Sequence, residues 1–237
     1  YENYTLDFGL YGFYDKGDIY KGYGGKFYNK YSFLKENKSK NYDLILDLGD
    51  FDGISNDGNN VVSLSRYGFT ASFSESFKIS NFNSNSKDLN QTNRYSSEII
   101  NKGIFLESKL SNGFYQYSDG TSQAVYSFEI GPSLVFGEFR KKLLDFTQIS
   151  IIPEFVLKNG ISPFAFDDFN NDSRIKFNLK QQLFGPLILG YQGDYNINTN
   201  SSEYATFENV RISLNVSRRA YSFGLSYSQD DKSILLG

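Results

Sequence analysis

The stretch Arg174–Gln182, RIKFNLKQQ, alternates apolar and polar side chains one by one. Ile175, Phe177 and Leu179 stand at every second position, and charged or amide side chains fill the positions between them. Because successive side chains of a β-strand point to opposite faces, this spacing predicts a strand with one apolar and one polar face. A soluble sheet buries its apolar face against a second layer, whereas a membrane β-barrel turns that face toward lipid and keeps the polar face inside.

The same two-residue period recurs along the chain and predicts about twelve strands. The segment Val61–Ile79 is predicted as one strand of about twenty residues, which is long beside the roughly five or six of ordinary strands and suits a strand that overhangs a bilayer. In the second strand, Gly22, Gly24 and Gly25 predict a kink or bulge. The expected strands are Tyr4–Tyr14, Ile19–Phe33, Tyr42–Phe51, Val61–Ile79, Gly103–Tyr117, Ala124–Phe136, Leu144–Leu157, Arg174–Leu183, Leu187–Ile197, Phe207–Ser217, Tyr221–Tyr227 and a last strand from Ser233.

Short and long connections tend to alternate between these strands. Asp119-Gly120, Phe184–Pro186 and Arg218–Ala220 are predicted as tight turns. Long loops on one side and short turns on the other are typical of outer-membrane barrels. Tyrosines near strand ends are candidates for the aromatic girdles of such a barrel, namely Tyr14, Tyr67, Tyr117, Tyr191 and Tyr227. The long polar connections are expected near residues 52–60, 80–97, 167–173 and 198–206.

Composition limits the classes of protein that the 237 residues can form. The chain contains 19 Tyr and 23 Phe but no Cys, Met, Trp or His, so it has no disulfide and no thiolate metal site. Richness in Tyr, Gly, Asn and Ser suits an outer-membrane barrel, and an AT-rich genome explains it equally well. The net charge of −3 argues against a nucleic-acid partner. No linker marks a boundary, and we expect residues 1–237 to form one all-β unit, a mature product or a fragment.

The absence of histidine excludes Ser-His-Asp hydrolysis, Cys-His nucleophilic catalysis and His-ligated zinc. Asp50/Asp52, Asp167/Asp168 and Asp230/Asp231 lie in expected loops or at strand ends, where solvated turns are the expectation. The oxygen-rich run 167–172 is a conceivable calcium site, but it lacks the regular spacing of a calcium-binding loop. We therefore predict no catalytic residue, no cofactor and no metal site.

The polar face of the opening stretch carries a basic stripe that continues on the strand at 207–217. In a barrel lumen, such a stripe could pair with lipid phosphates or steer anions. The alternative, which we favour, is that these charges balance carboxylates on neighbouring strands. The candidate lumen-facing residues, carboxylates included, are Arg174, Lys176, Lys180, Arg211, Asp194 and Glu129.

Five short motifs follow one another in the same order and spacing as in a known family. They are YSDGTSQ (Tyr117–Gln123), LDFTQ (Leu144–Gln148), SPFAFD (Ser162–Asp167), QQLFGPL (Gln181–Leu187) and SRRAY (Ser217–Tyr221). With them the chain resembles the C-terminal barrel region of cyanobacterial members of the outer-membrane lipopolysaccharide (LPS)-assembly family, LptD. The resemblance covers residues from about 100 to 230, and it leaves any lipid-binding residue unassigned.

The resemblance implies an antiparallel transmembrane β-barrel in the outer membrane, of which this chain is the C-terminal part. Such a barrel accepts LPS from a periplasmic protein bridge and releases it sideways into the outer leaflet, and a plug lipoprotein is a further partner to expect. These 237 residues show no counterpart of the family's periplasmic jellyroll or of the paired cysteines found in some of its members.

Two other functions fit the same strand pattern. A general porin-like channel would use long loops and lumen charges to select solutes, and it would conduct without any dependence on LPS. A β-sandwich binding module outside the membrane would stay monomeric and folded without detergent. The long strand at 61–79 and the charged faces at 43–47 and 174–182 weigh against the sandwich.

Overall fold

A computed structural model describes residues 2–35, 38–80, 102–137, 143–169, 171–197, 207–218, 221–229 and 232–236. The expected loop at 80–97, the loop at 198–206 and the pair Asp230/Asp231 lie wholly or almost wholly outside these residues. The chain forms two compact units. Unit 1 comprises Tyr1–Glu75, Ser108–Glu129 and Phe155–Asp172, and unit 2 comprises Ser76–Glu107, Ile130–Glu154 and Ser173–Gly237.

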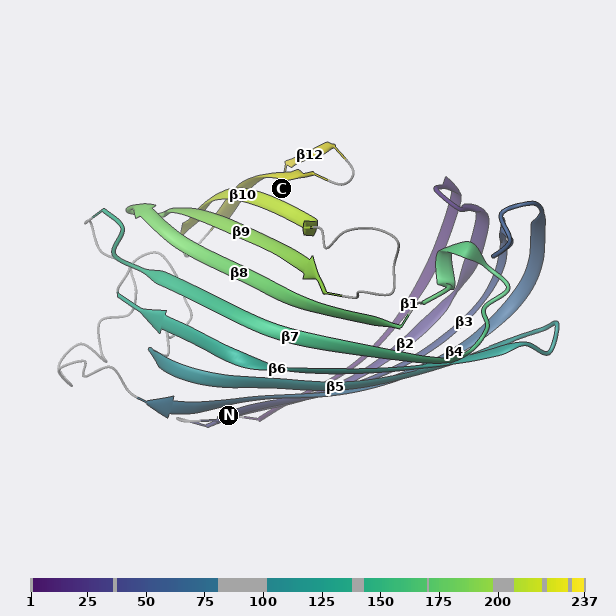
Figure 1. Ribbon diagram of the computed structural model, residues 1–237, viewed down its shortest axis with the longest axis horizontal. Helices are drawn as coiled ribbons and strands as arrows, with labels where there is room; N and C mark the ends of the chain where they lie inside the picture. Colours follow the sequence, from purple (N-terminus) through teal and green to yellow (C-terminus); the bar gives the residue numbers. More distant parts are fainter. Residues whose placement is uncertain are drawn as a thin grey trace. The chain divides into compact units, whose positions relative to one another are not determined.

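The predicted all-β, antiparallel fold is confirmed: the strands form a single 12-stranded sheet in the order of the sequence (Figure 1). β1 and β12 are the two edges, so the sheet is not closed within the described residues. Its strands are β1 (Glu2–Lys16), β2 (Ile19–Lys35), β3 (Lys38–Ile54), β4 (Val61–Ser80), β5 (Gly103–Tyr117), β6 (Ser122–Phe136), β7 (Thr147–Gly160), β8 (Asp172–Phe184), β9 (Leu187–Asn196), β10 (Phe207–Arg218), β11 (Tyr221–Ser228) and β12 (Ser233–Leu236).

Helical structure is sparse in the described part of the chain. One turn of 3₁₀ helix, η2 (Ala165–Asp167), interrupts the connection between β7 and β8, and the sequence pattern did not predict it. No helix in the described ranges has the length and apolar character needed to span a membrane.

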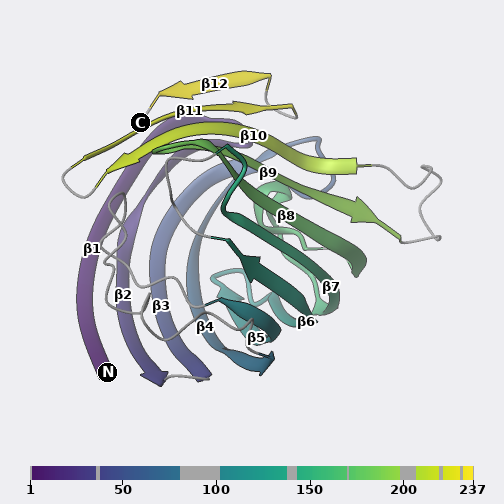
Figure 2. The same cartoon turned by 90° about the vertical axis from the view of Figure 1, so that its left-hand side faces the viewer.

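In unit 1, cross-strand pairing sorts side chains into apolar and polar rows on β1, β2 and β3, which lie side by side in Figure 2. Phe8 pairs with Phe27, which pairs with Leu46, and this row faces outward, with Phe8 64 % exposed. The next row joins Gly9, Lys26 and Asp47 on the opposite face, and Asp47 is buried. The predicted alternation is therefore present in three dimensions.

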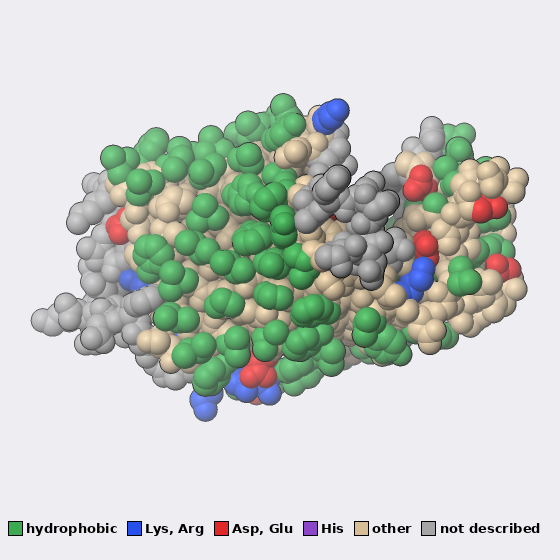
Figure 3. All heavy atoms as spheres, in the orientation of Figure 1, with side chains coloured by type: hydrophobic (Ala, Val, Ile, Leu, Met, Phe, Trp, Pro, Cys, Tyr) green, Lys and Arg blue, Asp and Glu red, His purple; other side chains and the backbone are tan. Residues whose placement is uncertain are grey.

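In unit 2 the rows alternate in the same way. Leu189, Leu214 and Leu225 face one another across β9, β10 and β11, and the row continues onto β12. The adjacent row consists of Gly190 and the two small polar residues Ser213 and Ser226. Figure 3 shows hydrophobic side chains gathered over the face of β8 and β9 that is turned toward the viewer.

Burial in this sheet is inverted relative to a soluble protein, whose interior is mostly apolar. Leu10 on β1 is 80 % exposed and Leu157 on β7 is 64 % exposed, whereas Glu154 on β7 is only 5 % exposed. β6 shows the pattern within one strand, because Tyr126, Phe128 and Ile130 are exposed while Glu129 is buried between them. The largest almost fully buried side chains are Tyr117, Phe164, Gln123, Gln182, Ser133 and Ser162.

The predicted turns at Asp119-Gly120 and Gly185-Pro186 are confirmed, with positive φ angles at both glycines. The turn predicted at Arg218–Ala220 falls mostly outside the described residues. β7 begins at Thr147, so the predicted start at Leu144 is wrong, and Leu144 adopts a left-handed turn conformation with φ of 54°.

The bulge predicted at Gly22–Gly25 is also wrong. These glycines pair regularly with β1, and the irregularity in register lies earlier, between Ile19 and Lys21. These glycines leave room for a side chain: Tyr11 pairs with Gly24, which in turn pairs with Gly49, and the Tyr11 hydroxyl lies close to both glycines. A β-carbon on Gly24 would approach the Leu48 carbonyl oxygen to 2.2 Å and the Tyr11 hydroxyl to 2.6 Å.

We therefore expect Gly24→Ala to lower the free energy of unfolding by about 1–3 kcal/mol, because a methyl group must displace the tyrosine or the backbone of β3. The matched control is Gly9→Ala on β1, where an added β-carbon meets no heavy atom within 4 Å. Denaturant titration of both variants measures the difference, and equal stabilities would contradict the close approach.

Candidate functional site

The most extensive buried polar cluster described in unit 1 is centred on Arg66 of β4. Its side chain is 11 % exposed and pairs with two carboxylates. Arg66 Nη2 contacts Asp47 of β3, and Arg66 Nη1 lies 2.9 Å from Oδ1 of Asp167, in the η2 segment. One guanidinium thereby joins a strand of the sheet to a connection about a hundred residues later in the sequence.

Asp47 also contacts polar side chains of β1 and β2, on the other side of β3. The Tyr11 hydroxyl donates to Oδ1 of Asp47 at 2.8 Å, and Lys26 Nζ lies 3.9 Å from Oδ2. Arg66, Tyr11 and Lys26 therefore compensate the burial of Asp47. Both carboxylate oxygens of this buried group are satisfied.

Both carboxylate oxygens of Asp167 also have partners. The Tyr117 hydroxyl donates to Oδ2 of Asp167 at 2.6 Å, and Gln123 Nε2 donates to its backbone carbonyl at 2.8 Å. Asp167 is 6 % exposed. The expectation that Asp167 lies in a solvated turn is therefore wrong, because an arginine and a tyrosine from two strands compensate its burial. The girdle position proposed for Tyr117 is wrong as well, since its ring is buried in this cluster.

Aromatic rings surround the ion pairs. The Arg66 guanidinium carbon lies 4.8 Å from the ring centroid of Phe51 and 5.5 Å from that of Tyr115, at cation–π distance from both. Phe164 packs with Phe51 and Tyr117 to form the buried hydrophobic core of unit 1. The rings shield the charges from water, which strengthens each ion pair.

Backbone contacts fix the same connection at its start. Ser55 and Phe164 form an isolated antiparallel bridge, and the Asn56 amide donates to the Pro163 carbonyl at 3.0 Å. In the turn that holds Ser55, the Ser55 hydroxyl and the Asn59 amide both donate to Asp57, and these hydrogen bonds lower the pKa of the Asp57 carboxyl. Residues 161–169, called the docked loop below, are thus anchored by main chain and side chains together.

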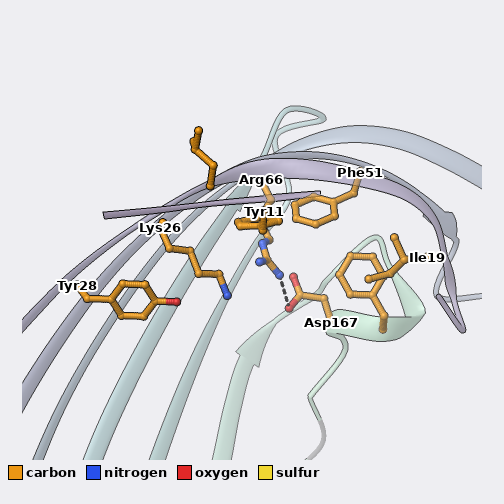
Figure 4. A pocket seen from close by; sticks show the side chains of 10 residues that line it. Tyr11, Ile19, Lys26, Tyr28, Phe51, Arg66 and Asp167 are labelled. Carbon is orange, nitrogen blue, oxygen red and sulfur yellow. Dashed lines mark ion pairs between the residues drawn. The ribbon is translucent and has the colours of Figure 1, made fainter. Parts of the chain in front are cut away.

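A cavity of about 370 Å³ lies beside the cluster. Figure 4 shows Asp167 reaching from the docked loop to Arg66, with Lys26 and Tyr28 projecting toward the same space. The cavity has aromatic walls and two cationic side chains, and Asp47 and Asp167 balance their charge. The arrangement is that of an internal anchor, and the described residues bring together no three carboxylates or other ligands that could hold a metal ion.

The predicted lumen residues of unit 2 form a second polar cluster. Arg174 Nε lies 2.6 Å from Glu154 Oε2, and Lys176 Nζ lies 2.9 Å from Glu154 Oε1. Arg174 also reaches Asp194 Oδ2 at 3.4 Å. The sequence pattern did not single out Glu154, which is the central acceptor of this cluster.

The remaining candidates are distributed between the units. Arg211 lines a polar cavity of about 430 Å³ in unit 2 together with Lys176 and Asp194. Lys180 lies exposed on β8 opposite Gly190. Glu129 belongs to unit 1, where it is buried 3.7 Å from Lys109 Nζ. The structure thus brings together four of the six predicted residues, namely Arg174, Lys176, Asp194 and Arg211.

Comparison with protein families gives one match, which spans most of the chain. The model of the family described as "Protein of unknown function (DUF3769)" matches residues 29–234. The chain belongs to the DUF3769 family. The DUF3769 match includes β3 to β11, the docked loop and the polar cluster of unit 2, and it includes Asp47, Arg66 and Asp167 of the first cluster but not Tyr11 or Lys26. Among curated proteins and solved structures, no match is found.

Proposed function

We propose that the chain is part of an outer-membrane β-barrel that inserts lipopolysaccharide into the outer leaflet. The observation that carries the membrane assignment is the inverted burial of the sheet: leucine and phenylalanine side chains face outward while Asp47, Arg66 and Glu154 are buried. A soluble sheet exposing such an apolar face would aggregate or bind a partner. In a bilayer the same face contacts hydrocarbon, and the polar face lines a hydrated interior.

Strand length supports the same assignment. β4 has 20 residues and β2 and β3 have 17 each, whereas about 9–11 residues of a tilted strand cross the hydrocarbon core. The surplus extends each strand beyond the bilayer on at least one side. The single 12-stranded sheet, with neighbours paired in sequence order, also disfavours a sandwich of two packed sheets.

The two edges of the sheet fit a larger barrel. β1 and β12 present backbone groups that need partners, and an unpaired edge is costly in lipid. In this proposal both edges are paired in the complete barrel. A closed barrel is the arrangement that satisfies every backbone group within the membrane.

The choice of lipopolysaccharide as cargo rests on the resemblance to the LptD family. The motifs that carry the resemblance supply the anchors of the interior: Tyr117, Gln123 and Asp167 in unit 1, and Gln182 in unit 2. A periplasmic bridge would deliver the lipid and a lipoprotein would plug the lumen. The protein then acts in transport rather than catalysis.

Depletion of the full-length protein in its native cell tests the proposal. Newly made lipopolysaccharide should disappear from the outer surface and accumulate in the periplasm or inner membrane, and re-expression should restore it. Depletion of an unrelated porin provides the control for general damage to the outer membrane. Unchanged surface lipopolysaccharide would reject the assembly role.

A further inference from the structure

The docked loop has the position and the contacts of a permeability barrier. It contacts the strands through their polar side chains: Asp167 pairs with Arg66 of β4, Tyr117 of β5 donates to Asp167, and the Gln123 side chain of β6 donates to its carbonyl. In Figure 4 the loop approaches β1–β4 from the side on which Tyr11, Lys26 and Arg66 project. The loop therefore occupies space on the face that the proposed function assigns to the lumen.

Burial distinguishes this loop from a surface connection. Ser162 and Phe164 are 0 % exposed, and Asp167 is 6 % exposed. Phe164 lies in the aromatic cluster, and the Ser162 hydroxyl caps the local backbone by accepting from the Phe164 amide at 3.1 Å. Connections normally run over the surface and carry exposed backbone. A loop with three buried side chains belongs to the packed interior of unit 1.

The ion pair between Asp167 and Arg66 connects the loop to β4, a strand that does not border the loop in sequence. The Asp167 carboxylate bonds to Arg66 of β4 and Tyr117 of β5, and the Asp167 backbone carbonyl accepts from Gln123 of β6. The neighbouring Asp168 pairs with Lys158 of β7, the strand from which the loop itself emerges. Loss of the Asp167 carboxylate would therefore release the end of the loop from Arg66 and Tyr117, whereas loss of the Asp168 carboxylate would remove only its ion pair with Lys158.

We propose that the docked loop is a fixed barrier to ions and small hydrated solutes in the lumen, and that the Asp167 carboxylate holds the end of the loop against β4 and β5. The proposal rests on the proposed function only in taking the polar face as the lumen. Loops that fold into the interior plug some outer-membrane barrels. Such a barrier would let a barrel move a large amphipathic cargo by another route without leaking salts through its interior.

The test is single-channel conductance of the full-length protein in planar bilayers of phosphatidylethanolamine and phosphatidylglycerol in KCl. Asp167→Ala should raise the unit conductance severalfold over the unsubstituted protein. The matched control Asp168→Ala, one residue away with the same change in charge, should leave it unchanged. Equal conductance of all three inserted proteins would overturn the barrier and leave the proposed function standing. If not even the unsubstituted protein enters the bilayer, both proposals fail.

A second variant keeps the test independent of any folding defect in Asp167→Ala. The chain has no native cysteine, so Ala165→Cys provides a single thiol in the half-buried part of the loop with its anchor intact. Reaction with a charged methanethiosulfonate reagent should change the residual conductance in a step if the loop lines the aqueous path. A labelled channel with unaltered conductance would overturn the proposal, and a step change would support it.

Discussion

Arg66→Ala is expected to destabilise the protein by about 3–5 kcal/mol, because it leaves buried carboxylates without their cation. Asp47 and Asp167 are 10 % or less exposed and share the one guanidinium. Lys26 cannot replace it, since its amine is 3.9 Å from Asp47 and is partly exposed to solvent. The substitution also removes the cation–π contact with Phe51, which adds to the loss.

Guanidinium unfolding of the protein in phospholipid vesicles, followed by circular dichroism, measures this loss. Arg211→Ala is the control: Arg211 is also an arginine on the polar face, but it is exposed, and we expect a change within about 0.5 kcal/mol. The double variant Asp47→Asn/Asp167→Asn in the Arg66→Ala background should recover part of the stability, because no buried charge is then left unpaired. Equal stabilities of Arg66→Ala and Arg211→Ala would show that the ion-pair cluster contributes nothing.

The second large effect is expected from Leu214→Arg, which should cost about 2–4 kcal/mol at the depth of the bilayer midplane. Leu214 is central in an apolar row that runs from Leu189 on β9 to Leu236 on β12. An arginine at this position would place its charge in hydrocarbon. Because Leu214 is already 39 % exposed, a soluble sheet would accept the same change with little loss.

The matched substitution is Ser213→Arg, one residue earlier and on the opposite face. Ser213 lies in the row of small and polar residues between β9 and β11, so its arginine would enter the polar interior. Unfolding in vesicles should show a clearly larger loss for Leu214→Arg than for Ser213→Arg. Equal losses would contradict the assignment of the two faces.

The strand pattern could be predicted from the sequence because a period of two residues assigns every side chain to a face without reference to other strands. Val61–Ile79 is an example, since β4 covers almost the same residues. Residue-by-residue pairing and closure are different: alternation fixes the face of each side chain, but a shift of two residues keeps every face, so the pairing depends also on turn geometry. The wrong start predicted for β7 has the same cause. Leu144-Asp145-Phe146 alternates like a strand, but these residues lie before the first residue of β7.

The candidate site was harder to predict because its members are far apart in sequence. Asp47, Arg66 and Asp167 each look like a single charge on a polar face or in a turn. One local signal was present: the connection at 161–169 contains four apolar residues before Asp167, among them Phe164 and Phe166. Solvated turns are usually built from polar residues, glycine and proline, so these side chains indicate a buried connection. Their burial against the sheet explains why the adjacent aspartate is buried with them.

Tryptophan scanning of β10 tests the orientation of the sheet most directly, since the chain has no native tryptophan. Single tryptophans at positions 211 to 216 would be reconstituted in vesicles that contain brominated phospholipid, which quenches fluorescence within the hydrocarbon region. We expect strong quenching at Ile212, Leu214 and Val216 and weak quenching at Arg211, Ser213 and Asn215, in phase with the pairing of β10 and β11. Uniform quenching along the strand, or none at any position, would contradict a sheet whose apolar face meets lipid.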